Sequence, residues 1–122
     1  MAKILLIEDD PALVKALGEF LSLAGYEVAS ALDGEAGLAL ARTERPDLIL
    51  LDLILPRLPG IEVLKELRKD PELAAVPVIV LTNVESTETV EQAVELGAKA
   101  YLVKTSYSLE EVLEKVKAAL GQ

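Results

Sequence analysis

Short runs of apolar residues alternate along the chain with longer stretches in which apolar residues recur every three or four positions. The short runs have the length of buried strands, and the longer stretches have the period of amphipathic helices. The apolar runs occupy residues 3–7, 26–31, 48–52, 77–82 and 99–103. We therefore predict five β-strands, each followed by a helix.

Residues at the ends of the helical stretches support this division. Asp10 and Pro11 suit the N-cap and the first position of a helix that Gly25 closes. Ser108 and Glu111 have the spacing of a capping box at the start of the last helix. Comparable signals place the other helices at about residues 34–44, 61–69 and 87–97.

Most of the predicted strands are apolar at consecutive positions, which is typical of parallel strands covered on both faces. Alternating strands and helices then predict an α/β fold with a single doubly wound, five-stranded parallel sheet. Ligands of such sheets bind outside the carboxyl ends of the strands, where the strand order reverses, and two orders are common. A length of 122 residues fits one domain, residues 1–122.

One carboxylate interrupts an otherwise apolar run. Asp52 lies in the middle of Leu-Ile-Leu-Leu-Asp-Leu-Ile-Leu, between two sets of branched apolar residues. Burying an ionised carboxylate without partners costs several kcal/mol, so Asp52 needs a compensating charge, hydrogen bonds or a cation. A residue that only ended a strand would not need apolar neighbours on both sides.

Polar residues stand at the carboxyl ends of four predicted strands. Glu8 and Asp9 follow the first strand, Asp52 ends the third, Thr82 ends the fourth and Lys104 follows the fifth. In the strand order 2-1-3-4-5 the three acidic side chains meet at the switch point, and such like charges need compensation. A hard divalent cation with oxygen ligands, Mg²⁺ or Mn²⁺, is the simplest remedy, assisted by the lysine.

The composition narrows the classes of function. Lys and Arg number 12 against 21 Asp and Glu, and the net charge of −9 argues against direct binding of nucleic acid or an anionic membrane. Without Cys or His, the chain has no disulfide, thiolate metal site or histidine chemistry. No apolar run reaches the roughly 20 residues of a membrane span and no signal peptide is recognisable, so we expect a cytoplasmic protein.

These residues, in this order and spacing, make the chain similar to the receiver domain of bacterial two-component response regulators, the CheY-like family. The resemblance covers the whole chain. Each residue alone is a weak signal, but Glu8, Asp9, Asp52, Thr82 and Lys104 together on five strand–helix repeats are a specific one. The resemblance implies a flavodoxin-like fold with strand order 2-1-3-4-5.

The resemblance also implies a reaction at Asp52. This side chain would accept a phosphoryl group from the phosphohistidine of a sensor histidine kinase or a phosphotransfer protein, and the receiver itself would catalyse the transfer. Asp9 would bind Mg²⁺ directly and Glu8 would do so through water, while Asp52 would also belong to the metal site and the carbonyl of Ile54 would supply a further ligand. Mn²⁺ is the alternative cation.

Two further roles follow from the same resemblance. Thr82 and Lys104 would contact the phosphoryl oxygens, and Tyr101 would follow the Thr82 contact as part of a switch, although a half-buried strand tyrosine explains Tyr101 equally well. The surface of the fourth helix, fifth strand and fifth helix would then bind a downstream effector or a second copy of the chain. The sequence stops before any DNA-binding helix-turn-helix, which fits either a stand-alone receiver or part of a longer regulator.

The sequence departs from the family pattern in the loops. The family usually has a cis proline after the lysine, whereas this chain has Thr105. A cis bond before a residue other than proline costs about 3 to 4 kcal/mol, so we predict a trans bond. Ile54 and Val84, two positions beyond the acceptor and the threonine, cannot orient an attacking water, which predicts dephosphorylation on the order of hours.

Three alternatives come from other classes of function. A haloacid-dehalogenase-type phosphatase needs a second Asp two residues after the first, where this chain has Ile54. A flavin or nucleotide site needs a phosphate-cradling loop after the first strand, where residues 8–10 are all acidic. A receiver fold used only as a structural or interaction module, natural, consensus or ancestral in type, remains open.

Overall fold

The apolar runs form a parallel five-stranded sheet in the computed structural model of the chain, which describes residues 1–83 and 86–122. The strands are β1 (Lys3–Ile7), β2 (Glu27–Ala31), β3 (Leu48–Leu51), β4 (Val78–Thr82) and β5 (Ala100–Val103). Their order is β2-β1-β3-β4-β5, and each neighbouring pair is parallel. The predicted fold class and strand order are therefore confirmed.

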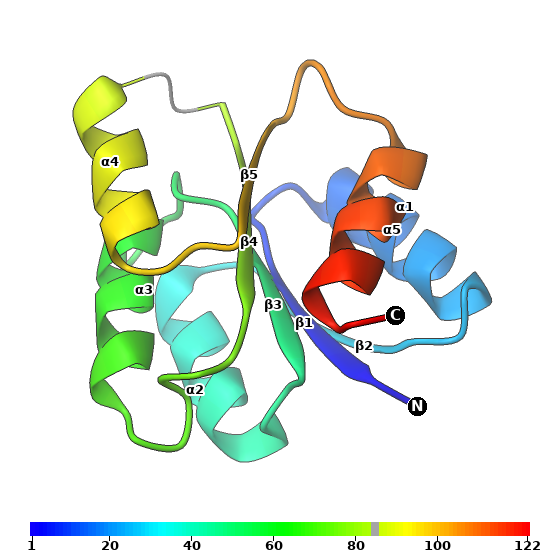
Figure 1. The fold of residues 1–122 in the computed structure, drawn as a ribbon, viewed down its shortest axis with the longest axis horizontal. Helices are drawn as coiled ribbons and strands as arrows, with labels where there is room; N and C mark the ends of the chain where they lie inside the picture. Colours follow the sequence, from blue (N-terminus) through cyan, green and yellow to red (C-terminus); the bar gives the residue numbers. More distant parts are fainter. Residues whose placement is uncertain (84–85) are drawn as a thin grey trace.

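Helices cover both faces of the sheet (Figure 1). They are α1 (Pro11–Leu23), α2 (Gly34–Glu44), α3 (Gly60–Lys69), α4 (Thr87–Glu95) and α5 (Leu109–Ala119). Because side chains alternate between the faces of a strand, β1 contributes Leu5 and Ile7 to one core and Ile4 and Leu6 to the other. The first core packs against α2, α3 and α4, and the second against α1 and α5.

The caps that the sequence indicated are present. The side chain of Asp10 accepts from the backbone N–H of Ala12, and Pro11 occupies the first position of α1. Ser108 and Glu111 form the reciprocal capping box of α5. These local bonds satisfy N–H groups that have no partner inside a helix, which fixes where each helix begins.

Four strands are one residue shorter than the sequence predicted. Tyr26, Asp52, Pro77 and Lys99 lie just outside β2, β3, β4 and β5. The backbone of Asp52 is still bonded to β1, because its N–H donates to the carbonyl oxygen of Ile7 at 3.0 Å. Asp52 thus lies at the first position beyond β3, at the carboxyl edge of the sheet.

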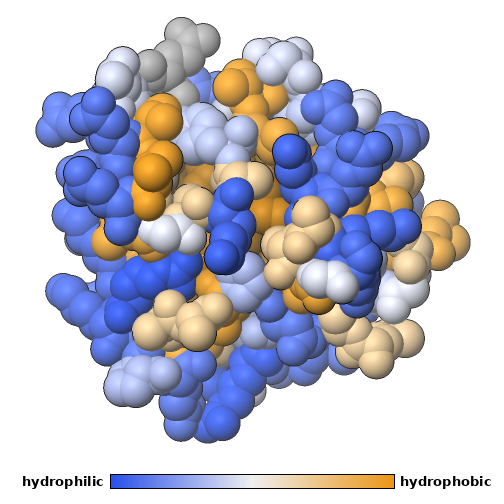
Figure 2. All heavy atoms as spheres, viewed as in Figure 1, coloured by the Kyte–Doolittle hydropathy of each residue, from blue (hydrophilic) through white to orange (hydrophobic). Residues whose placement is uncertain are grey.

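The carboxyl ends of all five strands lie at the same edge of the sheet, because the strands are parallel. This is the upper edge in Figure 1, from which the loops to the helices leave. The face seen in Figure 2 is largely hydrophilic, with apolar residues visible between the hydrophilic ones. Within the described part of the chain, every helix is too short or too polar to cross a lipid bilayer.

Candidate functional site

Three acidic side chains meet at the carboxyl edge of the sheet. Glu8 and Asp9 follow β1 and Asp52 follows β3, and these two strands pair with Ile7 opposite Leu51. Each of the three acids offers a carboxylate oxygen within 4.8 Å of the others. Glu8 and Asp52 are only 1% and 3% exposed, while Asp9 is exposed. The structure therefore brings together the acidic residues that the sequence predicted as a site.

Lys104 lies between two of these carboxylates. Its Nζ is 2.5 Å from Oε1 of Glu8 and 2.7 Å from Oδ2 of Asp52. The backbone holds the lysine in place, because its N–H donates to the carbonyl of Thr82 at 3.1 Å. The sequence predicted that Lys104 helps to compensate the three acids, and the structure shows that Glu8 and Asp52 are the two that it contacts.

Burial and ion pairing act in opposite directions on the pKa values of this cluster. Burial raises the pKa of Glu8, although its hydrogen bonds with Lys104 and with the backbone N–H of Asp10 oppose the change. Burial by itself would lower the pKa of Lys104, but the hydrogen bonds and charges of Asp52 and Glu8 outweigh it and leave this pKa raised. The lysine therefore stays protonated between its two acidic partners.

The loop after β3 fixes the orientation of Asp52. Its Oδ1 accepts from the backbone N–H of Ile54 at 3.0 Å, while Oδ2 contacts Lys104. Gly60 holds this loop close, because its N–H donates to the carbonyl of Leu53 and a Cβ at Gly60 would lie 2.3 Å from the carbonyl oxygen of Asp52. One carboxylate oxygen is thus committed to the loop and the other faces the cluster.

Thr82 and Tyr101 come from the two strands beyond β3. Thr82 is fully buried at the end of β4, and its register partner on β5 is Val103. Tyr101 lies two residues before Val103, and its pKa is raised by burial and by the negative charge of Asp52. The tyrosine is therefore close enough to sense the charge at the centre of the site.

Tyr107 belongs to the same neighbourhood and was not predicted. Burial raises the pKa of its hydroxyl, the charge of Lys104 lowers it, and the charges of Glu8 and Asp52 raise it further. The only hint of this role in the sequence is the position of Tyr107, an aromatic residue three positions after Lys104 in the loop that departs from the family pattern. Sequence spacing alone did not reveal that Tyr107 packs against the core of the α1 and α5 face, where the charges of the cluster act on its hydroxyl.

The loop after Lys104 otherwise agrees with prediction. The structure has no cis peptide bond among residues 1–83 and 86–122, so the bond between Lys104 and Thr105 is trans. A turn follows, in which the N–H of Ser106 donates to the carbonyl of Val103. Val84, which supports the expectation of slow dephosphorylation, lies outside the described residues.

The donor set fits a hard divalent cation. Three carboxylates and the ammonium of Lys104 leave the cluster with a formal charge of −2 when all four groups are ionised. All available side-chain ligands are carboxylate oxygens, which Mg²⁺ and Mn²⁺ prefer. Asp9 is exposed and so remains accessible to a cation from solvent.

Comparison with known proteins identifies the family of the chain and agrees with its fold. Residues 4–117 match the family described as the response regulator receiver domain, and the chain belongs to this family. Receiver domains of response regulators receive signals in phosphorelays, and the acidic pocket at the carboxyl edge of the sheet is the place where they bind metal.

Relatives of known sequence and structure include proteins of different length. The chain is 42% identical over 120 residues to the DNA-binding dual master transcriptional regulator RpaA of Synechocystis, covering 98% of this chain and 49% of that protein. It is 36% identical to protein PilH of Pseudomonas aeruginosa, with 99% of both chains covered. The chain thus spans about half the length of RpaA but nearly all of PilH.

The solved structure of the Vibrio cholerae chemotaxis protein CheY4 superposes closely. The TM-score is 0.90 at 32% sequence identity, and the alignment covers 98% of this chain and 99% of CheY4. A receiver domain from Methanospirillum hungatei gives a TM-score of 0.93 at 31% identity, with 99% and 94% of the two chains covered. The strand order and the helices on both faces are therefore those of known CheY-like receivers.

Proposed function

We propose that Asp52 accepts a phosphoryl group from a phosphohistidine on a sensor histidine kinase or a phosphotransfer protein. The observation that carries the proposal is the position of Asp52, which is 3% exposed, hydrogen-bonded to Lys104 and close to two further acids. A carboxylate oxygen of Asp52 would form the new bond to phosphorus while the bond from phosphorus to the histidine nitrogen breaks. The product is an acyl phosphate, whose lability suits a reversible signal.

Mg²⁺, or Mn²⁺ in its place, is the proposed cofactor. Asp9 and Asp52 would hold the ion directly, Glu8 would hold it through water, and the carbonyl of Ile54 would be a further ligand. When bound, the ion would neutralise negative charge on the phosphoryl oxygens.

The residues of the chain itself would align and stabilise the transferred group. The Lys104 ammonium already contacts the acceptor carboxylate, so it is placed to pair with a phosphoryl oxygen on Asp52. Thr82 ends the neighbouring strand and would donate its hydroxyl to another phosphoryl oxygen. The raised pKa of Lys104 ensures that its positive charge is available throughout the neutral range.

Signal output would use the face formed by α4, β5 and α5. If Thr82 bonds the phosphoryl group better in one arrangement of this face, phosphorylation shifts the population toward that arrangement. Tyr101 on β5 would move with Thr82 and report the change. The partner would be a downstream effector or a second copy of the chain, without direct contact to nucleic acid or membrane.

The test compares the protein with Asp52→Asn. Incubation with Mg²⁺ and acetyl phosphate should add the mass of one phosphoryl group to the native sequence and none to the variant. Tyrosine fluorescence recorded with beryllofluoride and Mg²⁺ should change only in the native sequence and should lose that change in Tyr101→Phe. A mass gain in Asp52→Asn would place the acceptor at another residue.

The same experiment separates signalling from a purely structural role. The second hypothesis, a receiver fold that serves as an interaction module, is favoured by the simple composition, with one Phe, no Trp, no Cys and no His. Absence of any Asp52-dependent mass gain or fluorescence change would support that hypothesis.

The lifetime of the phosphorylated form is a separate prediction. Ile54 has no group that could orient an attacking water, which predicts a half-life on the order of hours. Intact mass measured over time after removal of acetyl phosphate checks it, and Ile54→Asn should shorten the half-life. Decay of the native form within seconds would contradict the prediction.

A further inference from the structure

One arginine connects α3 with two other segments, the loop between α3 and β4 and the C-terminal end of α4. Arg68 donates through Nε to the carbonyl of Leu96 at 2.6 Å and through Nη2 to that of Gly97 at 3.4 Å. Its Nη1 donates to the carbonyls of Ala74 and Val76 at 3.2 and 3.0 Å. A single guanidinium therefore holds the loop that enters β4 and the end of α4 at the same time.

The carbonyls at the end of α4 need such a donor. The last carbonyls of a helix have no partner within it, and the backbone N–H groups of Gly97 and Ala98 satisfy only those of Val94 and Ala93. The guanidinium bonds the carbonyl of Leu96, the C-cap residue of α4. It also places positive charge at the negative end of a helix whose own last turn contains no basic residue.

Burial within α4 is concentrated at the same end. All residues of α4 are described, and Ala93 is the only one that is fully buried. Thr87 and Glu88, in the first turn, are exposed. The C-terminal half of α4 is thus attached by both packing and the arginine, whereas the N-terminal half has little apolar contact with the sheet.

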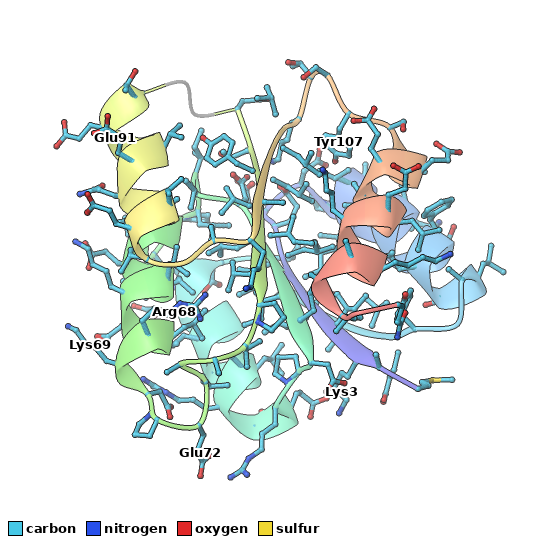
Figure 3. The ribbon with its side chains drawn as sticks, viewed as in Figure 1. Lys3, Arg68, Lys69, Glu72, Glu91 and Tyr107 are labelled. Atoms are coloured by element: carbon cyan, nitrogen blue, oxygen red, sulfur yellow. The ribbon has the colours of Figure 1, made fainter. Side chains whose placement is uncertain are left out.

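The chemistry of the contact requires an arginine. A guanidinium presents five N–H donors in a plane and can serve four carbonyls, whereas a lysine has three donors at one point. Among residues 1–83 and 86–122, Arg68 has no ion pair with an acid, and burial lowers its pKa. Lys69, the next residue, points outward in Figure 3 and is exposed.

We infer that Arg68 anchors the C-terminal end of α4 to α3, so that α4 responds to a phosphoryl group at Asp52 by moving its N-terminal half about this fixed end. Arg68 is thus a positioning residue of the switch and does not touch the reacting atoms. The inference deepens the proposed function and rests on it only where phosphorylation is concerned. The anchor itself is a property of the protein without cation or phosphoryl donor.

The anchor is tested first without Mg²⁺ or any phosphoryl analogue, by hydrogen exchange followed with mass spectrometry. Arg68→Met should accelerate exchange of the amides of residues 93–98 by about tenfold or more relative to the native sequence, because local opening there no longer has to break the two bonds from the guanidinium to the carbonyls of Leu96 and Gly97. Arg68→Lys should have a smaller effect, since it keeps the charge and loses the planar fork. Lys69→Met is the matched control and should leave these amides unchanged.

The direction of movement is tested next, with beryllofluoride and Mg²⁺. In the native sequence, exchange should change in residues 87–92 and stay protected in residues 93–98. In Arg68→Met the change should extend through residues 93–98. Equal changes in both halves of the native α4 would overturn the pivot, and unchanged exchange of residues 93–98 in both Arg68 variants would overturn the anchor.

The two proposals fail in different ways. If beryllofluoride produces no change in the native sequence, the proposed function fails while the measurement without cation still tests the anchor. Arg68→Lys preserves that test where Arg68→Met is too unstable to study, and urea unfolding of each variant separates local opening from global destabilisation.

Discussion

At the scale of single residues, Lys104 keeps two nearly inaccessible carboxylates compatible with folding. Its ammonium contacts Glu8 and Asp52, both of which are buried. Removing one partner from a buried ion pair leaves uncompensated charge and typically costs about 3 to 5 kcal/mol. The lysine therefore matters for stability before any phosphoryl group is present.

We predict that Lys104→Met lowers the free energy of unfolding of the cation-free protein by about 3 kcal/mol, measured by urea denaturation. Mg²⁺ should recover part of this loss, because it supplies positive charge to the same carboxylates. The exposed Lys99→Met is the control and should change stability little. A Lys104 variant as stable as the native sequence would show that the carboxylates are protonated or hydrated in its absence.

Tyr107 makes the site sensitive to high pH. Its folded-state pKa is raised above the ordinary value of 10.0, so the folded protein holds this proton more tightly than the unfolded chain does. The resulting stabilisation is complete below pH 10 and is lost as the pH rises through the folded-state pKa. In an absorbance titration of tyrosinate, Tyr107→Phe should lose amplitude above pH 10, and loss of amplitude below pH 10 would contradict the assignment.

At the scale of elements, the start of α3 determines the shape of the loop that carries Asp52. A Cβ on Gly60 would lie 2.3 Å from the Asp52 carbonyl oxygen and 2.4 Å from the Cα of Leu53, both of which belong to the backbone. By contrast, a Cβ on Gly18 in α1 would meet only a side-chain atom of Val28, at 4.0 Å. The two helices therefore tolerate an added methyl group very differently.

Gly60→Ala should destabilise the protein by about 2 kcal/mol and slow phosphorylation of Asp52 by acetyl phosphate, because the backbone after β3 has to move. Gly18→Ala should stabilise the protein by about 0.5 to 1 kcal/mol through lower chain entropy and leave phosphorylation unchanged. Thermal unfolding and the rate of mass gain measure both effects. Normal phosphorylation in Gly60→Ala would mean that the loop accommodates the methyl group without moving Asp52.

At the scale of the whole molecule, the negative net charge of the chain means that a bound cation should stabilise the folded state strongly. The chain carries a net charge of −9, and the one cluster of acids found to suit a metal within the described residues contains Glu8, Asp9 and Asp52. A ligand that binds only the folded state stabilises it by about 2.7 kcal/mol at a hundred times its dissociation constant. Stability should therefore depend on Mg²⁺ concentration.

We predict that Asp9→Asn abolishes most of the stabilisation by Mg²⁺, as measured by the shift in melting temperature across a cation titration. Asp10→Asn is the matched control, since it changes the neighbouring acid by the same step while an asparagine still caps α1. Equal responses of the two variants would point to screening of the overall charge rather than to a defined site.

The sequence by itself determined the secondary elements, their parallel arrangement and the residues of the acidic cluster. Apolar periodicity, caps such as Asp10 and Ser108, and turn residues act over a few positions, so they can be interpreted without the rest of the chain. Because the carboxyl ends of parallel strands share one edge, Glu8, Asp9 and Asp52 could be predicted to meet once the strand order was assumed.

The tertiary structure alone decided which groups pair across that edge and across the loops. Lys104 contacts Glu8, Tyr107 lies near the carboxylates, and Arg68 reaches the end of α4. Each of these interactions depends on side-chain direction and loop path between residues far apart in sequence. No local pattern encodes such distances, because they result from how the helices pack on the sheet rather than from the preferences of neighbouring residues.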